Sequence, residues 1–76
     1  MLEMNLPAYT VEIVDQDQRA QLIKLRAACP ASAAETALYT CSMSAAEAAR
    51  VRVWPGFYSA TPTFEPHHQA ERARAA

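Results

Sequence analysis

Few side chains in this sequence could act as nucleophiles or metal ligands. The thiols are Cys29 and Cys41, and the imidazoles are His67 and His68. Adjacent histidines point in different directions, and neither cysteine lies at zinc-finger spacing from them. A Cys–His nucleophile would need an electropositive site for the thiolate, which the neighbouring sequence does not offer. We therefore expect no metal, no cofactor and no enzymatic activity, with both thiols reduced and buried. A disulfide between the two is the alternative.

Acidic residues are concentrated near the beginning of the sequence. Residues 1–18 contain Glu3, Glu12, Asp15 and Asp17 and no base, whereas all seven Lys and Arg residues follow. This segregation produces a local negative field that attracts a basic partner, even though the net charge of the chain is only -1. Asp15 and Asp17 also suit a strand-to-helix junction, where acids cap helices. We predict that Glu12, Asp15 and Asp17 bind a partner protein.

The 76-residue length allows one domain and leaves little room for a large preorganised active site. The longest apolar runs are far shorter than the roughly 20 residues that cross a bilayer. The opening MLEMNLPAYT has neither a basic n-region nor a long apolar core. We expect a cytoplasmic protein without membrane contact, with a domain at 1–66 and a frayed tail at 67–76.

Alternation over Ala8–Val14 predicts a half-buried strand, with Tyr9, Val11 and Ile13 facing inward and Thr10 and Glu12 facing solvent. The spacing of Asp15 and Gln18 is that of a capping box. The apolar residues that follow predict a helix that Pro30 ends. Those residues are Leu22, Ile23, Leu25, Ala27 and Cys29.

Two further capping boxes, Ser32–Glu35 and Ser44–Glu47, predict short helices at 33–41 and 45–53. Two alternatives remain open, because ETALYTCSM at 35–43 and RVRVW at 50–54 also alternate as strands do. Pro55-Gly56 indicates a turn. The segment 57–64 contains Pro62 and therefore predicts an edge strand that pairs with 9–13. The expected fold is a small α+β domain in which an N-terminal and a C-terminal edge strand form an antiparallel sheet against two or three short helices.

Residues 37–52 also have the spacing of a helix-turn-helix motif, with Arg50 and Arg52 on the second helix. Its turn would contain Ser42 in place of the usual glycine. The start of its reading helix, Ala45-Ala46-Glu47, offers no donor to a base edge and repels phosphate. A small DNA-binding regulator is therefore the alternative function.

The strand YTVEIVD at Tyr9–Asp15, the predicted helix QDQRAQLIKLRAA at Gln16–Ala28 and the acidic opening resemble the general build of small anti-CRISPR proteins. Those proteins come from phages and mobile elements, and the resemblance is to the ones that act on type I effectors. The group shares no diagnostic motif, so no functional residue transfers by position. The resemblance implies a stoichiometric, non-enzymatic inhibitor in the bacterial host cytoplasm.

Such an inhibitor binds a subunit of the type I CRISPR surveillance complex and blocks DNA recognition. Glu12, Asp15 and Asp17 would imitate the spaced charges of a nucleic-acid backbone and occupy a basic groove on the partner. In this reading the protein itself binds no nucleic acid.

Overall fold

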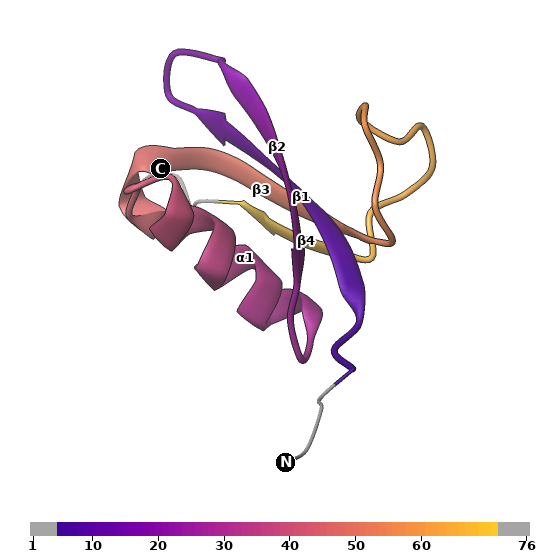
Figure 1. Cartoon of the computed structure of the whole chain (residues 1–76). Coiled ribbons are helices and arrows are strands. Elements are labelled where there is room, and N and C mark those ends of the chain that lie inside the picture. The colour runs from indigo at the N-terminus through magenta and orange to yellow at the C-terminus, as the bar shows by residue number, and fades with distance from the viewer. Residues whose placement is uncertain (1–4, 72–76) are drawn as a thin grey trace.

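Residues 5–71 are described in the computed structural model, and they form one antiparallel sheet with a single α-helix on one of its faces (Figure 1). The elements are β1 (Ala8–Asp15), β2 (Ala20–Arg26), α1 (Pro30–Thr40), the 3-10 helix η1 (Ala45–Glu47), β3 (Ala48–Pro55) and β4 (His68–Glu71). The four strands lie in the order β2-β1-β3-β4, and every pairing is antiparallel. The predicted α+β class and the antiparallel sheet are confirmed.

The predicted first strand is confirmed as β1, but β1 lies inside the sheet, between β2 and β3. Its apolar side chains Tyr9, Val11 and Ile13 form the core with the helix, as expected. Thr10 and Glu12 were expected in solvent, and both are buried. The sheet is therefore covered on both faces at β1.

The helix predicted from Asp15 to Cys29 is wrong, because this segment forms a hairpin turn and β2. Asp15 Oδ1 accepts the backbone N–H groups of Asp17 and Arg19, both at 2.9 Å. Gln18, with φ 68°, has the left-handed conformation that follows a type I turn in a three-residue hairpin loop. The polar residue that suggests a helix cap thus forms an Asx turn instead.

The helix predicted at 33–41 is present as α1, although it begins earlier than expected. Pro30 starts this helix because proline suits the first helical position, where the missing N–H has no intrahelical partner. Ser32 therefore lies inside the helix and cannot act as its cap. The buried residues of α1 are Ala33, Ala34 and Ala37, small side chains that allow the helix close to the sheet. The strand alternative for 35–43 is wrong.

A Schellman motif ends α1. The N–H of Ser42 donates to Tyr39 O, and the N–H of Met43 donates to Leu38 O. Ser42 has φ 54°, a left-handed conformation that disfavours a residue with a Cβ atom. Leu38 and Met43 both pack against the core, which fixes the path of the chain after the helix.

Ser42→Gly is expected to raise the free energy of unfolding by about 0.5–1 kcal/mol, because glycine adopts the left-handed conformation without the Cβ penalty. Chemical denaturation measures the change. Ser44→Gly is the contrasting variant, since Ser44 is extended (φ -86°) and its side chain takes part in the capping box of η1, so we expect glycine there to lower the free energy of unfolding. A loss of stability in Ser42→Gly would contradict this account of the turn.

The second short helix, predicted at 45–53, is limited to the three residues of η1. The open alternative of a strand at 50–54 is confirmed, since β3 pairs with β1 from Pro55 to Ala48. Val51 and Val53 face the helix with the core residues of β1. Burial of a β-branched face against two neighbours favours the strand over the helix start at Ser44.

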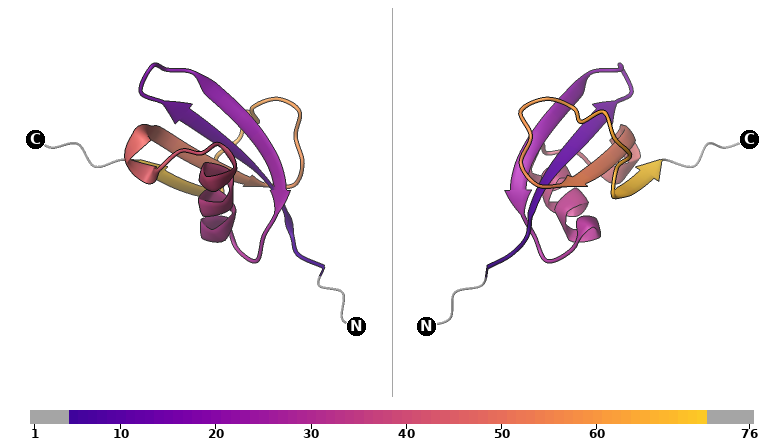
Figure 2. Two further views of the ribbon diagram at one scale, coloured as in Figure 1. Left: turned by 60° about the vertical axis from the view of Figure 1, so that its left-hand side comes forward. Right: turned by 90° about the vertical axis from the view of Figure 1, so that its right-hand side faces the viewer.

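The loop 56–67 covers the face of the sheet opposite α1 (Figure 2). Its segment 57–64 does not form the predicted edge strand. The C-terminal edge strand is β4, which pairs with β3 and not with β1, and β2 forms the other edge. Part of the segment 67–76, expected as a frayed tail, is ordered, because His68–Glu71 form β4; residues 72–76 lie outside the described part.

Candidate functional site

Glu12, the first predicted partner-binding residue, is a structural residue. It is 5% exposed, and its carboxylate pairs with Arg52, which faces it across β1 and β3. Arg52 Nε donates to Glu12 Oε1 at 2.7 Å, and Thr61 Oγ1 donates to Glu12 Oε2 at 3.2 Å. A carboxylate held in this way below the loop 56–67 cannot meet a partner's surface.

Asp15 and Asp17, the other two predicted residues, lie in the turn between β1 and β2. Asp15 is half-buried, and one of its oxygens is used by the turn. Asp17 is exposed. The predicted set of three is therefore divided, because Glu12 lies under the loop while the two aspartates lie at the end of the sheet. Glu3, which opens the acidic stretch, lies outside the described residues.

A third acidic residue, Glu47, lies near the two aspartates and was not among the predicted site residues. Asp15 is opposite Ala48 in the β1–β3 register, so Glu47 lies beside the same turn. The hairpin tip and η1 are neighbours in all three views (Figures 1 and 2). Glu47 is exposed, with one oxygen accepting the N–H of Ser44 at 2.8 Å. We call Asp15, Asp17 and Glu47 the acidic end.

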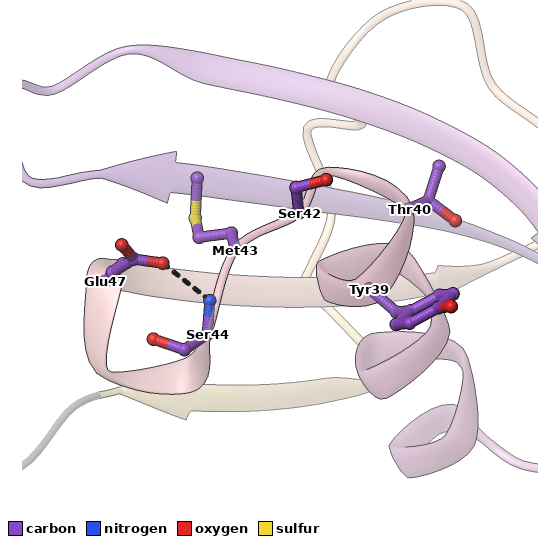
Figure 3. A pocket seen from close by; sticks show the side chains of 6 residues that line it. All are labelled: Tyr39, Thr40, Ser42, Met43, Ser44 and Glu47. Atoms are coloured by element: carbon purple, nitrogen blue, oxygen red, sulfur yellow. Dashed lines mark hydrogen bonds between the residues drawn. The ribbon is translucent and has the colours of Figure 1, made fainter.

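A pocket of about 650 Å³ lies between the end of α1 and η1, with Glu47 of the acidic end in its lining (Figure 3). It is lined by Tyr39, Thr40, Ser42, Met43, Ser44 and Glu47. Tyr39 extends from the last turn of α1 on one side, and Ser44 and Glu47 lie on the other. Tyr39 is 85% exposed, the highest value among the exposed large hydrophobic side chains of the described residues. The Tyr39 ring points away from Ser44 and Glu47 (Figure 3), so the space beside η1 is bordered by hydroxyl groups, by Met43 and by one carboxylate.

Polar contacts attach the loop 56–67 to the sheet. Thr10 Oγ1 donates to Gly56 O and accepts from Tyr58 N, both at 2.8 Å. Trp54, fully buried, donates from Nε1 to Phe64 O at 2.9 Å, and the Arg52 guanidinium lies 5.2 Å from the Trp54 ring centroid. We regard this face as a second, partly polar core.

The cysteines differ from expectation. Both are free, but Cys29 is exposed and Cys41 is only half-buried, so neither is the core thiol that we predicted. Cys41 Sγ lies 3.7 Å from Gln21 Oε1, a weak contact that connects the end of α1 to β2. Within residues 5–71, no group of three His, Cys, Asp or Glu side chains is placed to hold a metal ion.

The helix-turn-helix arrangement is wrong, because the presumed reading helix is η1 followed by β3. Arg52 is paired with Glu12, and Arg50 is half-buried within the same strand. The two arginines therefore do not lie on a helix that could enter a DNA groove. Among the described residues, no helix is long and apolar enough to span a membrane.

Comparison with models of known families, with curated proteins and with solved structures finds no match for this chain. Of the features on which the resemblance to anti-CRISPR proteins was based, the predicted helix at Gln16–Ala28 is absent, because this segment forms the turn and β2. The strand at Tyr9–Asp15 is present. The candidate site therefore rests on its own geometry, which places Asp15, Asp17 and Glu47 at one end of the sheet, with Glu47 also at the pocket.

Proposed function

We propose that this protein is a non-enzymatic inhibitor that binds a basic, nucleic-acid-binding surface of another protein. The observation that carries the proposal is the acidic end, where Asp15, Asp17 and Glu47 gather from two separate segments. The exposed carboxylates of Asp17 and Glu47, with the half-buried Asp15 between the turn and β1, attract a basic groove and steer its approach. Glu12 is not part of the binding surface and supports it only by stabilising the sheet.

The partner class that the sequence resemblance indicates is a subunit of a bacterial type I CRISPR surveillance complex. Its DNA-binding groove is basic, and occupation of that groove would block DNA recognition without any chemical step. The inhibitor would act stoichiometrically. The charge of the acidic end is modest, so we expect contacts beside it to contribute to affinity as well.

The test is an affinity capture of the tagged protein from a nuclease-treated lysate that contains type I effectors, with bound protein and residual DNA both quantified. We expect a near-stoichiometric effector subunit. Asp17→Lys with Asp15→Asn is expected to weaken its retention at least about tenfold at low salt, because charge complementarity is lost. Asparagine keeps the oxygen that the turn requires, so the hairpin should persist.

Glu65→Lys is the matched control, because it also replaces an exposed acid but lies in the loop 56–67. Equal retention of the effector by the double variant would refute the role of the acidic end. Recovery of DNA that elutes with salt, in place of an effector subunit, would favour the DNA-binding regulator instead.

A further inference from the structure

β2 forms one edge of the sheet, and no strand among the described residues pairs with its outer side. In an antiparallel ladder, alternate residues direct both of their backbone groups to the same neighbouring strand. Ala27 N donates to Pro7 O at 3.1 Å, and Asp15 N donates to Arg19 O at 2.9 Å. With the β1–β2 register, these bonds show that the odd-numbered residues of β2 direct their backbone groups to β1. The backbone groups that point outward are therefore those of Ala20, Leu22, Lys24 and Arg26.

The two faces of β2 differ in their chemistry, and Figure 2 shows β2 at the rim of the sheet, with α1 on one side and the loop 56–67 on the other. Towards α1, Ile23 and Leu25 pack against the core but are only half-buried, because α1 packs mainly on β1 and β3. On the other face Lys24 and Arg26 are exposed, and β2 contains no acid. The Arg26 guanidinium is held there, since it donates to the backbone at 2.8 Å and lies 5.3 Å from the Phe57 ring centroid.

We propose that this edge accepts an extended segment of a partner protein as an additional antiparallel strand, with acidic residues opposite Lys24 and Arg26 and apolar residues at the alternate positions. In such an addition the main-chain hydrogen bonds supply affinity and the alternate side chains supply specificity. Charge determines the occupant, because a second copy of β2 would bring its own Lys24 and Arg26 to the same edge, where like charges oppose pairing.

The order of the residues in the segment follows from the two ends of β2. An antiparallel segment begins opposite Arg26 and ends opposite Ala20, which lies next to the hairpin turn that carries Asp15 and Asp17. The acidic residues of the segment therefore belong in its first half, away from the acidic end. This edge is a different surface from the acidic end, so the inference does not depend on the proposed function.

The test is an NMR titration of the whole chain with the peptide acetyl-Glu-Val-Glu-Val-Thr-Val-Thr-amide. We expect saturable shifts in residues 20–26 and slower hydrogen exchange at the amides of Leu22 and Lys24. In an antiparallel addition the N–H groups of the two Glu residues face β2, whereas those of the valines face solvent. N-methylation of the two Glu residues should therefore abolish the saturable shifts, and N-methylation of the valines should retain them. Equal binding of the two methylated peptides would overturn strand addition.

Two variants locate the contact. Leu22→Pro removes an outward N–H and none of the bonds to β1, so we expect peptide binding to weaken at least about fivefold, as the loss of one hydrogen bond implies. Leu22→Thr is the matched control, because it also shortens the apolar side chain but keeps the N–H. Lys24→Gln is expected to weaken binding roughly two- to fivefold, as an exposed ion pair implies. Unchanged binding in both Leu22→Pro and Lys24→Gln would refute the site, and the methylated peptides test it in the unaltered chain if Leu22→Pro does not fold.

Self-association and the effector capture give outcomes that are separate from this result. Concentration-dependent broadening of residues 20–26 without peptide, abolished by Leu22→Pro, would overturn the acidic segment in favour of a second copy of the chain. Peptide binding without effector capture would refute the proposed partner and leave the edge site standing. Effector capture without peptide binding would support the acidic end and overturn the edge site.

Discussion

Glu12→Gln is expected to lower the free energy of unfolding by about 2–4 kcal/mol, towards the low end of the cost of breaking a buried ion pair. The substitution keeps the size of the side chain and removes its charge. Arg52, whose side chain is 24% exposed, then remains under the loop without a counter-ion. A chain of this length has roughly 4–11 kcal/mol of total stability, so the loss should be large enough to measure by urea denaturation.

A double-mutant cycle distinguishes the stability contributed by the Glu12–Arg52 ion pair from a general loss of stability in the sheet. Adding Arg52→Met to Glu12→Gln removes the unpaired charge, and we expect it to restore a substantial part of the lost stability. The two changes would then be strongly non-additive. If their effects simply add, the Glu12–Arg52 pair does not organise this face of the sheet.

Trp54→Ala is expected to lower the free energy of unfolding by about 3–5 kcal/mol, the usual cost of truncating a buried tryptophan. Trp54 is fully buried on the face opposite α1, where its Nε1–H holds the loop through Phe64 O. Circular dichroism during denaturation measures the loss. A change below about 1 kcal/mol would contradict the view that this face is a second core.

Trp54→Phe distinguishes the ring from its hydrogen bond. Phenylalanine keeps most of the buried surface but leaves Phe64 O without its donor, so we expect a smaller loss of about 1–2 kcal/mol. Hydrogen exchange should accelerate within the loop 56–67 more than in β1. Uniform acceleration across the sheet would show that Trp54 does not act through the loop.

The first strand could be predicted from the sequence because Tyr9, Val11 and Ile13 follow a strict alternation. The environment of its other face could not, because Glu12 is buried by Arg52 and by Thr61, partners 40 and 49 residues away along the chain. Local alternation reports which side chains share a face. It does not report what covers that face.

The error at β2 has a similar cause. Asp15 can accept backbone N–H groups in either a helix cap or an Asx turn, so its spacing to Gln18 does not decide between them. Ile23 and Leu25 fit both a helical face and a strand. The strand forms because β1 needs a hydrogen-bonding neighbour on that edge, and the pattern within residues 15–29 does not report this pairing with 8–14.

The candidate site was only partly predictable for the same reason. Asp15 and Asp17 remain at an exposed turn, as their polarity suggested. Glu47 lies near them because β3 pairs with β1 with Ala48 opposite Asp15. The prediction of a helix at 45–53 did not include this strand pairing. The capping box at Ser44–Glu47 was the only feature of the sequence that singled out Glu47. Its hydrogen bond from the N–H of Ser44 to Glu47 Oε1 is present.

The most direct measurement of the proposed function is target-DNA binding by a purified type I surveillance complex with increasing amounts of this protein. We predict that DNA binding is lost near a one-to-one ratio, and that the Asp15→Asn, Asp17→Lys variant restores it while Glu65→Lys does not. Undiminished DNA binding at a large excess of the unaltered protein would contradict the proposal.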